Sequence, residues 1–285
     1  MKTEMSSVTA SNDLTLVLAG TGKIGRRIVA RLAERGIPTR VGSRSGTPSF
    51  DWDDREGWDA ALDGVATAYV SYVPDLAVPG ATDAIRVFVE KAKRHCVRRL
   101  VLLSGRGEEE AQACERIVQA SGLEWTVIRA SWFDQNFSEG EFLGMVRSGA
   151  ITLPAGDIPE PFVDVNDIAD VAVAALTEDR HTGEIYEVSG PRLLTFADVA
   201  EELSHATGRE IRYIDIPHEA FTDGLRQSGA PEEMVWLLGY LFSTVLDGRN
   251  ASVSDGVQRA LGREPADFAD FARRIAATDA WKAAA

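Results

Sequence analysis

Short apolar runs alternate with amphipathic stretches through the first half of the chain. The apolar runs, which predict strands, span residues 14–20, 39–44, 66–73, 98–105 and 123–130. The amphipathic stretches between them, which predict helices, span residues 23–36, 55–64, 81–96 and 108–122. Because these strands are apolar enough to be covered on both faces, the alternation predicts an α/β fold with a doubly wound parallel sheet of the Rossmann type.

In the second half of the chain, apolar runs and amphipathic stretches alternate less regularly. Residues 161–179 and 183–190 predict a further helix and strand that return to the sheet, whereas residues 137–160 and the segment after 191 predict mainly helices and loops. We therefore expect a flexible tail, a Rossmann domain and a smaller, mostly helical C-terminal lobe over the carboxyl edge of the sheet. Their bounds are 1–13, 14–190 and 191–285, with residues 137–160 contributing to the lobe.

Composition narrows the classes of partner. The chain of 285 residues has 44 acidic and 30 basic residues, and the resulting net charge of -14 disfavours binding to nucleic acid or to an anionic membrane surface. Cys96, Cys114 and the four histidines show no metal-ligand spacing, so no metal is expected. No apolar run approaches the roughly 18 residues of a membrane span, and the first residues lack a secretory signal. We expect a cytoplasmic monomer or homodimer.

The clearest motif lies between the first predicted strand and helix. Gly20-Thr21-Gly22-Lys23-Ile24-Gly25 is a G-x-G-x-x-G that follows an apolar strand and begins an amphipathic helix. In this context Gly20 permits the tight turn, Gly22 lets the backbone approach a pyrophosphate, and Gly25 permits close helix-sheet packing. The motif predicts a dinucleotide cofactor, and a glycine-rich turn without a ligand is the alternative.

The end of the second predicted strand indicates which dinucleotide binds. An NAD site usually has an acidic residue about 20 residues after the glycines, for the ribose 2′-hydroxyl, but no acid occurs between Glu34 and Asp51. Instead, Ser43, Arg44 and Ser45 offer a guanidinium and two hydroxyls to a 2′-phosphate. This predicts NADP(H), unless Arg44 is only a solvated surface charge. Asp51 and Trp52, at the end of the next short extended segment, lie where an adenine would rest, although Trp52 could equally belong to the core.

Several stretches together resemble a known family. They are AGTGKIGRRIV, DWDDREGWDAALDGV, LVLLSG, ASGLEWTVIRASWFDQNF, PFVDVNDIADVAVAAL and TGEIYEVSGPRLLTFADVAEEL. They are similar to the NmrA-like branch of the atypical short-chain dehydrogenases/reductases. The resemblance implies the same fold, NADP(H) along the sheet edge and a substrate cleft bordered by residues 130–137, among them Trp132, Phe133, Gln135 and Asn136. The cofactor contacts that it implies are Thr21, Lys23, Ile24, Arg44, Asp51, Trp52, Ser71, Tyr72 and Val73.

One departure from the wider superfamily concerns the proton donor. Typical members use a Ser and a Tyr-x-x-x-Lys, in which the lysine lowers the pKa of the tyrosine, but none of the five tyrosines here has a lysine four residues later. Ser104 matches the superfamily's serine position and could hydrogen-bond a substrate oxygen. An equal alternative is that its hydroxyl only hydrogen-bonds to nearby backbone groups. The proton would then come from Ser104, a water, the cofactor ribose or a phenol of the substrate.

Two functional classes follow. The first is an NADPH-dependent reductase that reduces a carbonyl, quinone or conjugated double bond, since some members of this branch are ketoreductases that tailor aromatic polyketide antibiotics. The second is a non-catalytic NADP(H) sensor, like the namesake regulators of the family. Aromatic and apolar side chains that could line a flat substrate cleft, or else form the core of the lobe, are Trp132, Phe133, Phe137, Phe221, Met234, Trp236, Tyr240 and Phe242.

Overall fold

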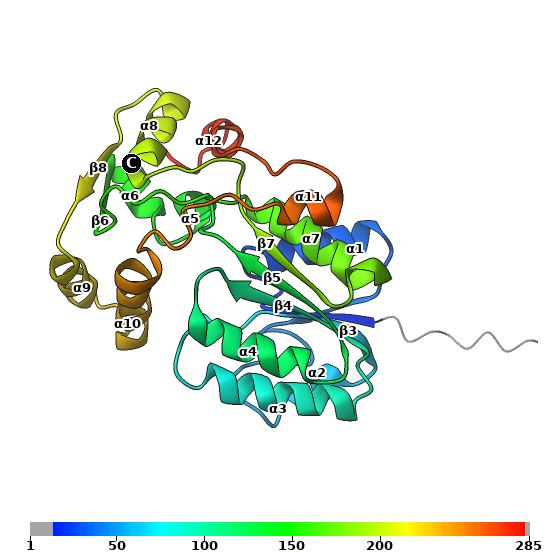
Figure 1. Ribbon diagram of the computed structural model, residues 1–285. Helices are drawn as coiled ribbons and strands as arrows, with labels where there is room; N and C mark the ends of the chain where they lie inside the picture. Colours follow the sequence, from blue (N-terminus) through cyan, green and yellow to red (C-terminus); the bar gives the residue numbers. More distant parts are fainter. Residues whose placement is uncertain (1–13, 283–285) are drawn as a thin grey trace, which may run out of the picture.

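The computed structural model describes residues 14–282, so the tail predicted over residues 1–13 lies outside the described residues. Six parallel strands form one sheet, as the sequence predicts, and their order is β2-β1-β3-β4-β5-β7 (Figure 1). Their bounds are β1 (Leu14–Leu18), β2 (Thr39–Gly42), β3 (Val65–Val70), β4 (Arg99–Gly105), β5 (Glu124–Ala130) and β7 (Glu184–Val188).

Helices cover both faces of this sheet because its strands are apolar on both sides (Figure 1). Side chains alternate along β1, so Leu16 and Leu18 pack in one layer and Val17 in the other. The first layer contains α2 (Trp58–Leu62), α3 (Ala81–Arg94) and α4 (Glu109–Gln119). The second layer contains α1 (Gly25–Glu34), α7 (Val165–Thr177) and α11 (Gly256–Leu261), and a short 3-10 helix, η1 (Asp179–His181), follows α7.

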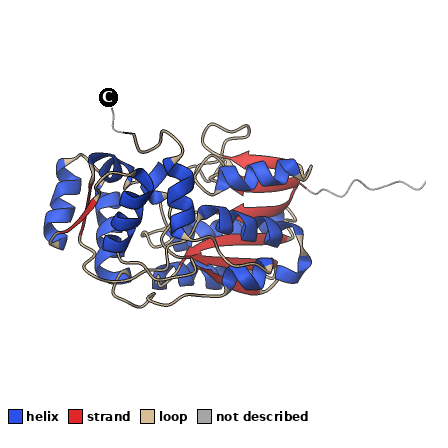
Figure 2. Ribbon diagram, turned by 90° about the horizontal axis from the view of Figure 1, so that it is seen from above, coloured by secondary structure: helices blue, strands red, loops and turns tan. Residues whose placement is uncertain are grey.

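A second body of structure lies beyond the carboxyl ends of the strands (Figure 2). Its own apolar core is rich in phenylalanine and includes Phe137, Phe196 and Phe268. Its helices are α5 (Asn136–Glu139), α6 (Leu143–Ser148), α8 (Phe196–Thr207), α9 (His218–Gln227), α10 (Glu232–Tyr240), the π-helix η2 (Leu241–Val245) and α12 (Phe268–Ala276). The lobe is thus mostly helical, as expected.

Two features of the lobe differ from the prediction. A parallel pair of short strands, β6 (Ala150–Leu153) and β8 (Arg212–Asp215), lies in a region predicted as helix and loop. In addition, α11 leaves the lobe and packs on β7 and α7, where a Cβ on Gly256 would lie 1.9 Å from the Glu187 carbonyl oxygen. The division at residue 191 therefore holds only in part, because the chain returns to the sheet after the lobe.

No helix within residues 14–282 is long and apolar enough to cross a membrane. The same residues contain no group of three or more His, Cys, Asp or Glu side chains placed to hold a metal ion.

Candidate cofactor and active site

A cavity of about 450 Å³ lies between the carboxyl edge of the sheet and the lobe. Its lining comes from the loops that follow β1, β3, β4 and β5, and from α10, η2 and the segment near Asn250. This is the edge at which open parallel sheets bind their ligands. The fold therefore assembles, at one place, loops that are far apart in the sequence.

The loop after β1 has the shape of an anion cradle. A Cβ on Gly25 would lie 2.2 Å from the Ala19 carbonyl oxygen, so only glycine allows the start of α1 to approach β1 this closely. At Gly22 the same carbonyl would be 3.2 Å away, and this residue lines the cavity. Within the described residues, the backbone N–H groups of Lys23 and Ile24 donate to no backbone carbonyl. They remain available to a phosphate, which fits a dinucleotide.

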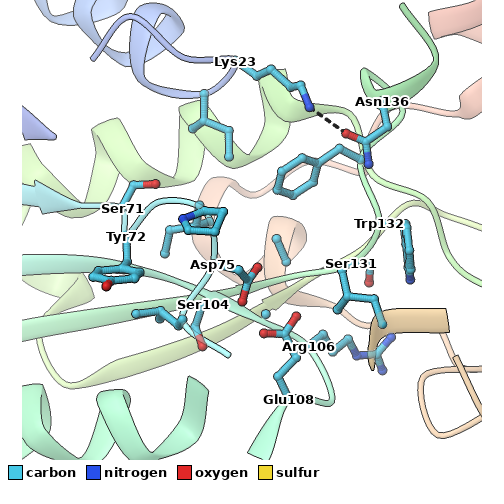
Figure 3. Close-up of a pocket in the computed structure, with 18 of the residues that line it drawn as sticks. Lys23, Ser71, Tyr72, Asp75, Ser104, Arg106, Glu108, Ser131, Trp132 and Asn136 are labelled. Atoms are coloured by element: carbon cyan, nitrogen blue, oxygen red, sulfur yellow. Dashed lines mark hydrogen bonds between the residues drawn. The ribbon is translucent and has the colours of Figure 1, made fainter. Parts of the chain in front are cut away.

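Lys23 adds a positive charge beside this cradle. Its ammonium group donates a hydrogen bond to Asn136 Oδ1 at 2.9 Å across the cavity (Figure 3). Burial is the main cause that lowers the pKa of Lys23. Arg27 in α1 also pairs with Glu139 in α5 at 2.7 Å, so two contacts fasten the loop after β5 above the phosphate loop.

The predicted 2′-phosphate site lies outside the cavity, at the end of β2. Arg44 is exposed and forms no ion pair or side-chain hydrogen bond with any residue of the described chain. The hydroxyl oxygens of Ser43 and Ser45 lie 3.5 Å apart beside it. The guanidinium is therefore free to meet a ligand, and its role stays a prediction.

The residues predicted around an adenine are differently placed. Trp52 is 9% exposed, packs in the core against Phe50 and Trp58, and donates from Nε1 to the Ser71 carbonyl at 3.1 Å. Asp51 is partly exposed and accepts from Trp58 through its carbonyl oxygen. Trp52 thus holds the loop after β3 in place, which is the core role that the sequence left open. Contacts of Asp51 and Trp52 with a cofactor stay predictions.

That loop, Ser71 to Val73, lines the cavity, and its contacts with a cofactor stay predictions. The Tyr72 ring packs against Trp52, with ring centroids 4.8 Å apart, and burial is the main cause that raises its pKa. Val73 is exposed at the cavity mouth.

Ser104 lies at the end of β4 in the cavity wall, but its hydroxyl is already engaged. Its Oγ donates to Glu115 Oε1 at 2.6 Å, and Arg129 holds the same carboxylate from the other side, at 2.6 Å. Ser104 is only 4% exposed. The proton of Ser104 is therefore directed at α4 and not at the cavity. This favours the alternative that Ser104 hydrogen-bonds to a neighbouring protein group, here the Glu115 side chain, and not to a substrate.

Two acidic residues that the sequence analysis missed face the cavity. Asp75 follows β3 and Glu108 precedes α4, and both line the cavity beside Ser104 (Figure 3). Glu108 is 6% exposed, and its Oε2 receives no hydrogen bond from any donor in residues 14–282. Burial and the charge of Asp75 raise the pKa of Glu108, and burial also raises the pKa of Asp75. In the sequence, Glu108 is the first of three consecutive glutamates and resembles a solvated helix start.

The predicted substrate residues divide into two groups. Trp132, Phe133 and Asn136 line the cavity, but Gln135 and Trp236 do not. Gln135 is buried beneath it, where its amide donates to Asp164 at 2.7 Å and accepts from the Val165 N–H at 2.8 Å. Both hydrogen bonds of Gln135 are made at the start of α7, and this placement does not support a role in the substrate cleft.

Trp236 lies on the outer face of α10, 43% exposed and stacked on Tyr240 with centroids 5.4 Å apart. It borders a separate hollow together with Val235 and Tyr240, whereas Leu238 is the α10 residue that lines the cavity. Among the other aromatic candidates, Phe137, Phe221 and Phe242 are core residues. Cavity-lining residues of the lobe that the sequence analysis missed are Phe142, Leu238, Leu241 and Val245.

Two known families match the chain, each over more than half of its residues. Residues 19–179 match a family described as NAD(P)H-binding, so the class is that of nicotinamide-dinucleotide proteins. Residues 110–271 match the NmrA-like family, and the chain belongs to this family. The predicted family, fold, cofactor class and oxidoreductase class are thereby confirmed.

Individual relatives span nearly the whole chain. Agroclavine dehydrogenase from Claviceps fusiformis is 33% identical and the match covers 90% of this chain and 95% of that protein. Prestalk A differentiation protein A from Dictyostelium discoideum is 28% identical, with 94% of each chain covered. The structure of an NADPH-dependent quinone oxidoreductase from Escherichia coli, complexed with NADPH, superposes with a TM-score of 0.77 at 19% identity, covering 92% of this chain and 99% of that one.

Proposed function

We propose that this protein is an NADPH-dependent reductase that transfers hydride to a carbonyl of a hydrophobic substrate of the polycyclic aromatic, polyketide type. The observation that carries the proposal is the continuity of the cavity. Its wall runs from the phosphate loop at Gly22 and Lys23 to the aromatic rings of Trp132 and Phe142 without interruption. One space can therefore hold the reactive end of a dinucleotide and an apolar substrate together.

The cofactor end uses residues of the Rossmann part. The N–H groups at the start of α1 and the Lys23 ammonium would bind the pyrophosphate, and Arg44 with its neighbouring serines would bind the 2′-phosphate. When bound, NADPH supplies the hydride. The preference for NADPH over NADH rests on the unpaired Arg44 and on the absence of an acid at the end of β2.

The substrate end uses residues of the lobe. Trp132 packs against Phe142 and Phe242, with centroids 6.2 and 5.0 Å apart, and this arrangement holds the Trp132 ring in the cavity wall. Leu238 and Leu241 add aliphatic surface opposite the sheet edge. A flat apolar ring system fits such a lining, because aromatic walls exclude water and offer broad contact area.

A second candidate is a non-catalytic NADP(H) sensor. The missing Tyr-x-x-x-Lys favours it, and one relative in the comparison bears the name of a differentiation protein rather than of an enzyme. A sensor, however, needs no apolar extension of the cavity beyond the cofactor.

NADPH consumption against a panel of quinones and polycyclic aromatic ketones, phenanthrenequinone among them, tests the choice. We expect turnover with at least one member and stoichiometric reduced product. Tight NADPH binding without turnover of any member would favour the sensor. Trp132→Ala should raise KM for the turned-over compound while NADPH affinity stays unchanged, because Trp132 belongs to the apolar end alone.

A further inference from the structure

The cavity contains a pair of acidic side chains to which the proposed function assigns no role. Asp75 and Glu108 reach it from different loops, and their carboxyl groups point toward each other (Figure 3). Two ionised carboxylates are both acceptors only, so such a contact is favourable only when one of them carries a proton. The Ala77 N–H donates to Asp75 Oδ1 at 2.8 Å, which stabilises Asp75 as the charged member.

The surroundings of Glu108 leave the proton on that residue. The acidic groups that act on Glu108 are Asp75, Glu110 and Glu115, and all three disfavour its ionisation. The two arginines of this region are occupied: Arg106 binds Glu187 at 3.0 Å and Ser252, and Arg249 pairs with Asp247 at 2.8 Å. Tyr240, at the end of α10, hydrogen-bonds to Glu110. Within the described chain, no cation contacts the Glu108 carboxyl.

We propose that Glu108 is the proton donor of the reductase, taking the place of the missing tyrosine, with Asp75 as the residue that keeps it protonated and positioned. The inference rests on the proposed function. In the step, the hydride that the cofactor supplies forms a bond to the carbonyl carbon, and the C=O π pair takes the proton of Glu108. The carbonyl is reduced to an alcohol, the cofactor is oxidised, and Glu108 becomes a carboxylate that regains a proton from water.

The other polar groups in the cavity wall are less suited to this role. The Ser104 proton is engaged by Glu115, and the Lys23 ammonium is engaged by Asn136 beside the phosphate loop. Ser131 faces the cavity with an unpaired hydroxyl, but an aliphatic hydroxyl is too weak an acid to donate at neutral pH. Tyr72 also lines the cavity, but burial raises the pKa of its phenol and makes it a weaker acid. Among the described residues of the wall, Glu108 combines a removable carboxyl proton with an oxygen that has no hydrogen-bond partner.

Glycine at position 105 is part of the same arrangement. A Cβ on Gly105 would lie 1.9 Å from Glu108 Oε1, so the carboxyl packs where a larger residue would have a side chain. Gly105→Ala therefore provides a second, independent perturbation, because it moves the carboxyl and leaves its chemistry intact.

The first test needs no turnover. In the infrared spectrum of the whole protein at neutral pH, the difference between the wild type and Glu108→Gln should contain the C=O stretch of one protonated carboxyl. Glu160 and Asp134, whose pKa values are also raised by burial, contribute equally to both spectra and cancel in this difference. Glu109→Gln, which changes an exposed neighbour, should retain the band of Glu108. Asp75→Asn should move the pH at which this band disappears to lower values, because it removes a charge that opposes ionisation of Glu108.

The second test is the kcat of NADPH oxidation with phenanthrenequinone, or with the most active ketone of the panel. Because a donor must be protonated, wild-type kcat should fall as pH rises through the raised pKa of Glu108. Glu108→Gln should lower kcat about 100-fold or more and lose this dependence, with NADPH affinity unchanged. Gly105→Ala should lower kcat less, and Glu109→Gln should match the wild type.

The outcomes separate the two proposals. Turnover by the wild type together with an infrared band or a pH profile that Glu108→Gln does not change overturns the donor role alone. No turnover of any panel member overturns the reductase function and the donor role with it, and the infrared band then shows only whether Glu108 stores a proton.

Discussion

Arg44→Ala should reduce the affinity for NADPH and leave the affinity for NADH unchanged. Arg44 is exposed and forms no ion pair with other described residues, so its removal leaves no protein group unpaired and costs the fold little. A charge-assisted contact to a 2′-phosphate contributes about 1.5–3 kcal/mol, and solvent exposure places Arg44 at the lower end of this range. The expected loss is therefore about tenfold in Kd for NADPH.

Calorimetric titration of both cofactors into the wild type and the variant measures this effect. Arg40→Ala is a matched control, since Arg40 lies in β2, just before Arg44 in the chain, but donates to the carbonyls of Ala61 and Asp63. The control should leave the ratio of the two affinities unchanged. Equal NADH and NADPH affinity in the wild type, or an equal loss of both in Arg44→Ala, would refute the assignment of the 2′-phosphate site.

Three further predictions concern other positions. Gly22→Asp should abolish NADPH binding in a fluorescence titration while thermal unfolding stays cooperative, because Gly22 faces the cavity. Gly25→Ala should instead destabilise the fold, since its Cβ would lie 2.2 Å from the Ala19 carbonyl oxygen. Ser104→Ala should lower kcat by less than about tenfold but reduce stability to urea by about 1–2 kcal/mol, because Glu115 loses a hydrogen bond; complete loss of turnover would make Ser104 the donor. Burial raises the pKa of Glu160 from 4.5 to about 7, so its protonated form stabilises the fold below pH 4.5 and this contribution is lost as pH rises through about 7. In urea unfolding between about pH 5 and 8, the wild type should therefore lose about 2.5 kcal/mol more stability than Glu160→Gln. Parallel stability curves for the two proteins would contradict this prediction.

The Rossmann part of the fold could be predicted because its signals are local. The period of the apolar runs predicts each strand, and the glycines at 20, 22 and 25 predict the turn that the structure contains. The pair β6 and β8 could not be predicted in the same way. Each of these strands has only four residues, and their partners lie about 60 residues apart in the chain, so pairing depends on the tertiary fold and not on a local pattern.

The candidate site was predictable where one sequence motif forms it and not where loops converge. The phosphate loop is contiguous, whereas Asp75 and Glu108 become neighbours only when β3 and β4 lie side by side. Gln135 and Trp236 illustrate the opposite case. Both types of residue suit a binding cleft, but packing decides the direction of each side chain. Gln135 hydrogen-bonds to Asp164 and to the Val165 N–H at the start of α7, and Trp236 lies on the outer face of α10.

In the proposed function, one cavity brings the nicotinamide and the substrate together for direct hydride transfer. This transfer can be followed with NADPH deuterated at the reactive carbon of the nicotinamide, on either face in turn, and a ketone from the panel. We predict that the product alcohol carries one deuterium on its carbinol carbon with one of the two labelled cofactors, and none there when unlabelled NADPH is used in heavy water. A product without deuterium from either labelled cofactor, or no product at all, would contradict the account.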